Sequence, residues 1–205
     1  AGTQRGSRAY APPWIRDGGM TACALLRWGR HADALAFLEW YAPFQYGDGK
    51  VPCCVDRRGS DPVPEHDSHG EFIYLAAECY RHTGDRAAVQ RVWPHVAAAA
   101  AYIDTLRRQR IGPEWEAPDK REFLGLLPPS ISHEGYSAKP MHSYWDDFWA
   151  LRGLGDAVFL ARALGRDTDA WKLGASRDAF ARDLSASIAA AMEKHDIEYV
   201  PGCAD

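Results

Sequence analysis

The chain has 205 residues, of which 46% are hydrophobic and 25% are charged, and its formal net charge is -4. This size and composition are typical of a globular chain with a buried core, and the acidic balance argues against nucleic acid as a partner. No stretch reaches the roughly 18 consecutive apolar residues of a transmembrane helix, so we expect no membrane partner.

The first ten residues, AGTQRGSRAY, contain neither an initiator Met nor the apolar stretch of a signal peptide. We therefore expect a cut N-terminus and no signal peptide within this sequence. Asn is absent and Arg far outnumbers Lys, a bias that indicates a GC-rich, bacterial genome. The location stays open between the bacterial cytoplasm, the periplasm and secretion.

Apolar residues recur at helical spacing in three segments, residues 20–28, 72–80 and 148–164. Each segment ends at a Gly-based stop, GRHAD, TGDRA or LGRDTDA, and a second, Ala-rich amphipathic run follows it. Each pair of runs predicts two antiparallel helices joined by a short turn. We therefore expect an all-α fold, a single domain of residues 1–205 built from three helical hairpins.

Two connections between the predicted hairpins, residues 45–66 and 110–142, are long and rich in Pro, Gly and charged residues. Structureless loops of this length in a compact domain are usually functional, so we expect them to contribute to a site. The chain ends in EYVPGCAD, where the repeat would begin a fourth hairpin. We therefore expect a truncated array, whose open edge is covered by further hairpins or by a partner chain.

Each predicted first helix is preceded by an acidic and aromatic segment: WIRD at 14–17, EHDSHGEF at 65–72 and HSYWDDFW at 142–149. If the first helices form the inner layer, their N-termini share one end of the array and the three segments meet there. Carboxylates accept hydrogen bonds from paired hydroxyls, and indole faces stack against the C–H surface of a sugar ring. The sequence therefore predicts a carbohydrate site at this end.

These segments resemble the six-hairpin glycosidases, the (α/α)6 toroids that include glucoamylases and glycogen-debranching glucosidases. The similarity lies in WIRDG at 14–18, EHDSHGEFIYLAAECYRHTGD at 65–85 and GLLPPSISHEGYSAKPMHSYWDDFWALRGLGDA at 125–157, and it covers most of the chain. The resemblance implies a partial (α/α)6 toroid with about three of the six hairpins. It also implies a glycoside hydrolase that cleaves an oligo- or polysaccharide with acid assistance and inversion, without a cofactor or metal.

The resemblance also implies a set of residues that bind the carbohydrate substrate. Trp14, Arg16 and Asp17 match the segment that holds the sugar in the -1 subsite, and Glu65 and Asp67 match a second motif. Further predicted contacts come from the same segments and the long loop: His66, Trp115, His142, Trp145 and Asp146.

The general acid of the family lies in the loop before the third inner helix, where Glu134 of SHEGY is the best match. Glucoamylases carry a Trp–Glu pair at this position, and here such a pair, Trp115–Glu116, lies upstream of GLLPP. The acid is therefore Glu134 or Glu116. The general base of the family comes from a later hairpin, so we expect it outside this chain.

Several of these residues also have structural interpretations. Asp17 is a candidate N-cap for a helix that starts near Gly18, and Ser68 and Glu71 form the pattern of a capping box. Aromatic residues at helical spacing are typical of the core between two helix layers, which applies to the following four: Trp28, Trp145, Phe148 and Trp149. Asp147 is open between capping and substrate contact.

Two other functions stay open. His66, Asp67 and His69 are candidate ligands of a metal-dependent hydrolase, and a non-catalytic carbohydrate-binding or structural α/α module is the second alternative. The Cys53–Cys54 pair adds little to the metal hypothesis, because vicinal cysteines rarely chelate one ion. We interpret the five cysteines as reduced thiols without a disulfide framework.

Overall fold

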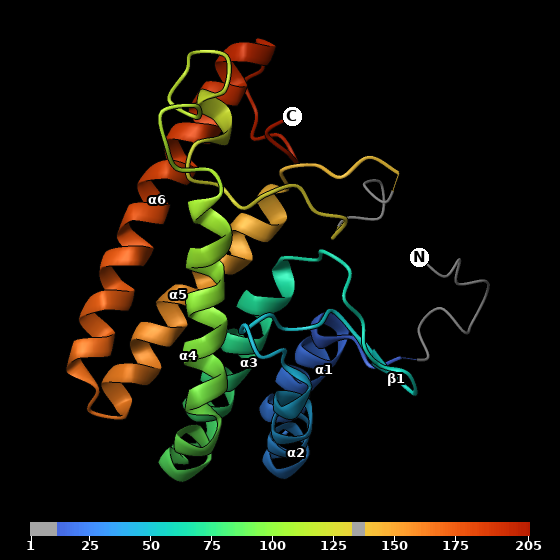
Figure 1. Cartoon of the computed structure of the whole chain (residues 1–205). Coiled ribbons are helices and arrows are strands. Elements are labelled where there is room, and N and C mark those ends of the chain that lie inside the picture. The colour runs from blue at the N-terminus through green and yellow to red at the C-terminus, as the bar shows by residue number, and fades with distance from the viewer. Residues whose placement is uncertain (1–11, 133–137) are drawn as a thin grey trace.

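The computed structural model describes residues 12–132 and 138–205, and this part of the chain is mostly helical (Figure 1). Within these ranges, six α-helices form three hairpins: α1 (Ile15–Arg27) with α2 (His31–Tyr41), α3 (Asp67–Thr83) with α4 (Arg86–Arg108), and α5 (Tyr144–Ala163) with α6 (Asp167–His195). Short elements lie in the connections: the 3-10 turns η2 (Ala42–Phe44) and η3 (Arg121–Phe123) and the strands β1 (Val55–Asp56) and β2 (Gly59–Ser60). The prediction of helical hairpins is confirmed.

The helices form two layers. α3 packs between α1 and α5, so the first helices of the three hairpins form an inner row. Each second helix packs on the first helix of its own hairpin, and α2 and α4 also contact the first helix of the next one. All three hairpin turns lie at one end, at the bottom of Figure 1, and the long connections gather at the other end. The N-termini of α1, α3 and α5 therefore face the connections.

The hairpin turns follow the predicted Gly-based stops. Gly84 is the C-cap of α3 with a φ of 65°, a left-handed conformation that costs glycine little. Gly29 and Gly165 adopt the same conformation after α1 and α5, with φ values of 76° and 72°. Each glycine ends the first helix and allows the chain to reverse into the second.

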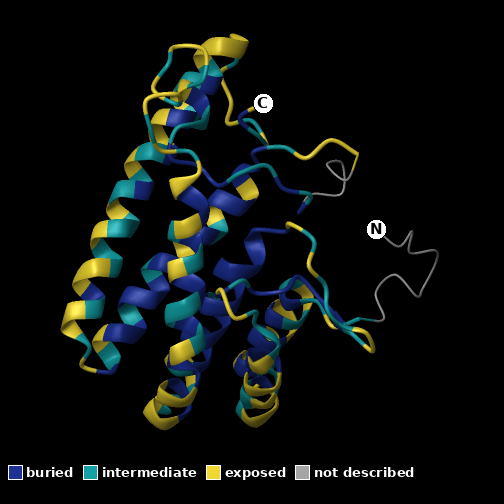
Figure 2. Cartoon of the chain, viewed as in Figure 1, coloured by how far each residue is buried: buried dark blue, intermediate teal, exposed yellow. Residues whose placement is uncertain are grey.

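The inner helix α3 is buried along most of its length (Figure 2). Phe72, Leu75 and Ala76 belong to the hydrophobic core that joins the two layers. Gly70 permits the close approach of α5, because a Cβ atom at residue 70 would lie only 2.0 Å from the carbonyl oxygen of Trp149. The crossing brings the polar first turns of α3 and α5 together.

Both helix-capping predictions are wrong. α1 begins at Ile15, so Asp17 lies inside its first turn, and the N-cap residue is Trp14 without a side-chain cap. α3 begins at Asp67 with His66 as its N-cap, so Ser68 is already inside the helix. Glu71 therefore has no capping partner, and both of its carboxyl oxygens are buried without a hydrogen bond.

Three of the four aromatic residues interpreted as core lie at the surface: Trp28, Phe148 and also Trp145, which is 41% exposed. Trp28 is 84% exposed, because it is the C-cap of α1 and lies at the hairpin turn. Phe148 is 48% exposed on α5. Helical spacing alone therefore did not identify which aromatic side chains face the interior.

The long connections are fastened to the N-terminal ends of the inner helices. The Ile15 N–H donates to the Cys53 carbonyl at 3.0 Å, and the Val55 N–H donates to the Pro13 carbonyl at 3.1 Å. In the second connection, Ser130 and Met141 exchange backbone hydrogen bonds of 2.9 and 3.1 Å. No helix in the described ranges combines the length and apolar character needed to cross a membrane.

Candidate functional site

The three acidic and aromatic segments meet, as expected, at the N-terminal ends of the inner helices. We call residues 14–18, 65–71 and 142–149 the mouth. Its centre is Asp67, which is completely buried at the start of α3. Arg16 of α1 donates a hydrogen bond from Nη1 to Asp67 Oδ2 at 2.9 Å, and Trp145 of α5 donates from Nε1 to the same oxygen at 2.9 Å. One carboxylate thus joins all three inner helices.

The side chains around Asp67 remain partly open to solvent. Trp145 is 41% exposed although its indole nitrogen is bonded inward. The Arg16 side chain is 30% exposed, and its Nη1 also lies 3.5 Å from Glu65 Oε2. Trp14 lies beside this group, with the Arg16 guanidinium 5.5 Å from its ring centroid. The mouth therefore offers a fixed indole and a guanidinium next to buried carboxylates.

The mouth contains four further buried carboxyl groups, and most of their oxygens lack a hydrogen-bond partner. The buried atoms without a partner include Glu65 Oε2, both oxygens of Glu71, both oxygens of Asp146 and Asp147 Oδ2. A buried carboxyl group without a partner costs free energy, so such groups are rare in native structures and usually serve a function. Their concentration at one place is the strongest indication of a functional site in the described residues.

Burial raises the pKa of these carboxyl groups. Burial and the neighbouring Asp67 raise the pKa of Glu65 to about 7, although Arg16 opposes this shift. Burial also raises the pKa of Asp147 to about 7, against the Leu127 N–H that donates to its Oδ1 at 3.0 Å and the nearby Arg107. A carboxyl group that keeps its proton near neutral pH can donate as well as accept a hydrogen bond.

Burial has a stronger effect on the pKa of the other two carboxyl groups, those of Glu71 and Asp146. Burial, together with Asp67, raises the pKa of Glu71 and of Asp146 well above their ordinary values. The hydroxyls of Ser130 and Ser132 lie near Asp146 and oppose its shift, but they do not reach good hydrogen-bonding geometry with it. The mouth therefore contains several carboxyl groups that hold their protons more tightly than free carboxyl groups do.

The two histidines of the second segment are buried and uncharged. Burial lowers the pKa of His66 to about 3, and the positive charges of Lys50 and Arg110 add to the effect. Burial also lowers the pKa of His69 well below its ordinary value, and its Nδ1 accepts the Val51 N–H at 3.1 Å. In the described part of the chain, His66, Asp67 and His69 do not bring three ligand atoms together as a metal site requires.

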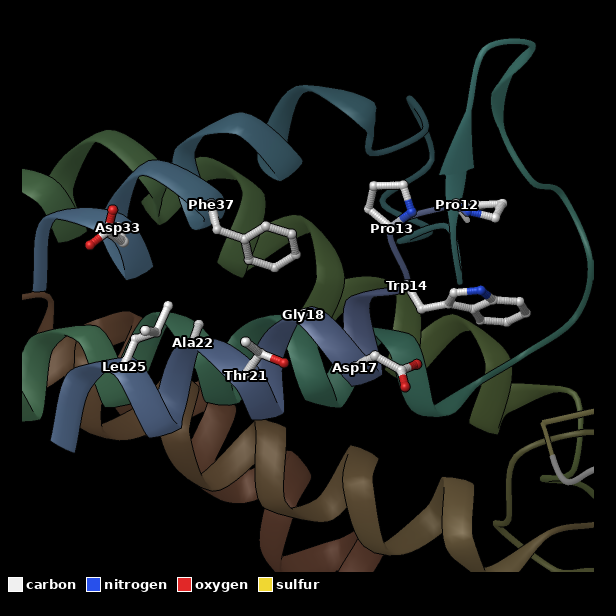
Figure 3. Close-up of a pocket in the computed structure, with 10 residues that line it drawn as sticks. All are labelled: Pro12, Pro13, Trp14, Asp17, Gly18, Thr21, Ala22, Leu25, Asp33 and Phe37. Atoms are coloured by element: carbon white, nitrogen blue, oxygen red, sulfur yellow. The ribbon is translucent and has the colours of Figure 1, made fainter. Parts of the chain in front are cut away.

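Asp17 lines a separate groove that does not include Arg16. The groove lies between α1 and α2 and has a volume of about 330 Å³. Its lining combines apolar residues and Trp14 with three polar residues, Asp17, Thr21 and Asp33 (Figure 3). Phe37 of α2 packs against Gly18, where a Cβ atom would lie 2.1 Å from the ring. The adjacent residues Arg16 and Asp17 thus serve two different surfaces, and Trp14 borders both.

Two other predicted site residues, His142 and Trp115, have different partners from those of Asp67. The ring of His142 stacks on Phe123, its Nε2 accepts from Arg110 Nε at 3.1 Å, and its Nδ1 lies 3.2 Å from Asp205 Oδ1. Trp115 is half-buried, and the Arg110 guanidinium lies 4.5 Å from its ring centroid. His142 and Trp115 are thus joined to each other through Arg110.

Of the two candidates for the general acid, only Glu116 lies in the described part of the chain. Glu116 is exposed, and none of the hydrogen bonds or ion pairs in the described ranges connects it to Arg16 or Asp67. Glu134 lies outside the described residues.

The structure adds two carboxyl groups that the sequence analysis left undecided or interpreted as structural. Glu71 follows Asp67 by one helical turn, and this spacing places both side chains on the same face of α3. Asp147 uses one oxygen to hold the Leu127 backbone and leaves the other without a partner. The spacing of Asp67 and Glu71 was the signal that could have identified Glu71.

A surface with exposed indole, a guanidinium and buried carboxyl groups can bind a neutral, hydroxyl-rich ring, because each hydroxyl needs both a donor and an acceptor. It can also hold protons near neutral pH for transfer to an oxygen atom. Comparisons of the chain with protein-family models, with curated proteins and with solved structures give no match.

Proposed function

We propose that this chain is part of the catalytic domain of a six-hairpin, (α/α)6-type glycoside hydrolase, and that its mouth binds the sugar. The observation that carries the proposal is the convergence of Arg16 and Trp145 on one oxygen of the buried Asp67. It fixes an indole with an exposed face beside charged groups that hydroxyls can bridge. The parallel inner helices with the polar mouth at their N-termini are consistent with a portion of a toroid.

In the proposed complex, each group at the mouth has a separate task. The exposed face of Trp145 stacks on the sugar ring, and the indole nitrogen keeps its bond to Asp67. Arg16 donates to a sugar oxygen from the exposed part of its guanidinium, while Glu65 receives or donates a hydrogen bond according to its protonation. These contacts hold the ring in a fixed orientation.

Cleavage of the glycosidic bond then requires a proton donor and a base that activates water. Glu134 or Glu116 protonates the leaving oxygen, a step worth roughly 10²- to 10⁴-fold in rate. For an inverting reaction, the base lies about 6.5–9.5 Å from the acid, with a water between the base and the anomeric carbon. We propose that this base belongs to a hairpin outside this chain, so the chain alone binds sugar without turnover.

Calorimetric titration with gluco-, galacto-, manno- and rhamno-configured mono- and disaccharides tests the proposal. We expect at least one of them to bind the wild-type chain. Asp67→Asn removes the negative charge that holds Arg16 and Trp145 in place, so we expect the loss of their fixed orientation to weaken binding by about tenfold or more.

Two matched variants make the titration decisive. Asp167→Asn changes an exposed aspartate in the first turn of α6 and should leave sugar affinity unchanged. Because Asp67 is buried, Glu65→Gln provides a second, less disruptive change at the mouth, and circular dichroism verifies that each variant is folded. A folded wild-type chain that binds no sugar of the panel would contradict the proposal.

A further inference from the structure

Cys53, Cys54 and Asp61 form a cluster beside the mouth that the proposed sugar site does not use. One ligand atom from each residue, two Sγ atoms and a carboxyl oxygen, lies within 4.8 Å of the other two. Both thiols are buried and free, and Asp61 is half-buried. In the described ranges, this is the only group of three such side chains with that spacing.

The backbone holds the three residues in place. The turn between β1 and β2 returns the chain so that the Asp61 N–H donates to the Cys54 carbonyl at 3.0 Å. On the other side of the pair, the Ile15 N–H donates to the Cys53 carbonyl at 3.0 Å. The ligand atoms are therefore carried by a paired backbone that needs little rearrangement to bind an ion.

The spacing agrees with the size of a tetrahedral metal site. Bonds of about 2.3 Å to sulfur and about 2.0–2.2 Å to oxygen place these two atoms roughly 3.5 Å apart across a tetrahedral ion. Cys54 Sγ lies 3.9 Å from Asp61 Oδ2, so a movement of a few tenths of an ångström suffices. Thiolates also prefer soft or borderline cations to Ca²⁺ and Mg²⁺.

The charges around the cluster favour a cation. The carboxyl groups of Glu65 and Asp61 lie near Cys53, so negative charge surrounds the two thiols. The nearby positive charge is that of Lys50, whose ammonium group donates to the Pro62 carbonyl. A divalent cation would displace the thiol protons and neutralise the resulting thiolates.

We propose that Cys53, Cys54 and Asp61 bind a thiophilic divalent cation of the class of Zn²⁺ and Cd²⁺, with a fourth position open to water. On sequence alone, Cys53 and Cys54 had little weight as metal ligands, because the third ligand becomes visible only when the β1–β2 turn returns Asp61 to them. The ion fastens the hairpin to the segment that carries Trp14, because Cys54 pairs with Trp14 across an antiparallel bridge. The site thereby stabilises one wall of the mouth.

Titration of the reduced, metal-stripped chain with Cd²⁺ tests the proposal through the near-ultraviolet charge-transfer absorption of cadmium thiolates. We expect this absorption to saturate at one Cd²⁺ per chain and the thermal midpoint to rise with Cd²⁺. Cys54→Ser should abolish the absorption. Asp61→Asn changes a half-buried side chain and keeps its size, and it should weaken Cd²⁺ binding by at least about tenfold.

Cys203→Ser is the matched control, because it removes a half-exposed thiol away from the cluster and should leave Cd²⁺ binding unchanged. The proposal is overturned by a wild-type chain without cadmium-thiolate absorption, by absorption that persists in Cys54→Ser, or by an Asp61→Asn affinity equal to that of the wild type. None of these readouts involves sugar binding, so the outcome is independent of the proposed function.

Discussion

Gly153 of α5 lies directly against Gly70 of α3, so that a Cβ atom at residue 153 would be 2.7 Å from the Gly70 Cα. The two helices touch through their backbones at this point. Gly153→Ala should therefore force α5 away from α3 and lower the free energy of unfolding by about 1–3 kcal/mol or more. Urea denaturation of the variant measures this loss.

Gly174→Ala is the matched control for this prediction. Gly174 lies inside α6, and a Cβ atom there meets no other atom within 4 Å. Because alanine favours helix more than glycine by up to about 1 kcal/mol, this variant should be as stable as the wild type or more stable. If both substitutions changed the free energy of unfolding equally, the close contact of α3 and α5 at Gly153 would not contribute to stability.

Arg107 of α4 binds both the loop between residues 110 and 142 and the outer helix α6. Its guanidinium donates from Nε to the Gly125 carbonyl at 3.0 Å, pairs with Asp183 at 2.6 Å and lies 4.4 Å from the ring centroid of Phe180. Arg107→Met should lower the free energy of unfolding by roughly 3 kcal/mol, because Asp183 and the Gly125 carbonyl lose their donor. The neighbouring Arg108 is exposed, so Arg108→Met should change stability by less than about 0.5 kcal/mol. A loss of similar size in both variants would refute this role.

The buried carboxyl groups predict that the protein becomes less stable as pH rises. Burial raises the pKa of Glu65 and of Asp147 to about 7, and it raises those of Glu71 and Asp146 well above their ordinary values. The folded state then holds these protons more tightly than the unfolded state, so stability is lost as pH rises from the unfolded pKa values through the folded ones. The urea midpoint should therefore fall between pH 5 and pH 8.

Two buried histidines, His66 and His69, have the opposite effect and make the protein less stable as pH falls. Burial lowers the pKa of His66 to about 3 and that of His69 well below its ordinary value, so their contribution to stability is lost as pH falls. This contribution is complete above the unfolded histidine pKa of about 6.5, where the carboxyl groups alone determine the trend. Asp147→Asn should make the decline of the midpoint with pH shallower. A midpoint that rises steadily from pH 5 to pH 8 would contradict the buried-carboxyl account.

Trp145 is expected to contribute to sugar binding in two separable ways. Trp145→Phe keeps an aromatic face but removes the indole hydrogen bond to Asp67, so we expect a moderate loss of affinity. Trp145→Ala removes both and should weaken binding by about tenfold, since aromatic contacts contribute roughly 0.5–1.5 kcal/mol. Trp171 is 75% exposed on α6, and Trp171→Ala should bind sugar as the wild type does. Calorimetry that ranks all three variants equally would remove Trp145 from the site.

Much of the fold was predictable because it depends on local patterns. The 3.6-residue apolar spacing and glycines such as Gly84 identified three hairpins, and the segments before the first helices indicated which end is polar. The helix starts were not predictable, because no side chain caps α1 or α3. Trp28 was misassigned because an apolar side chain at helical spacing is not buried when the helix ends beside it.

The sequence indicated which segments form the site, but not which of their side chains contact one another. Arg16 and Asp17 are adjacent in sequence, yet successive residues on a helix point in different directions, so only Arg16 reaches Asp67. Glu71 was interpreted as a cap because the pattern SHGE matched a capping box, whereas tertiary contacts bury its side chain between helices. The approach of Asp61 to Cys54 depends on a turn that the sequence did not reveal.

The most direct test of the central claim is the crystal structure of the chain with its tightest-binding saccharide. The account predicts a sugar ring against the exposed face of Trp145, with hydroxyl groups within hydrogen-bonding distance of Arg16 or Glu65. A saccharide bound only in the groove between α1 and α2, without contact to Arg16, Asp67 or Trp145, would contradict it.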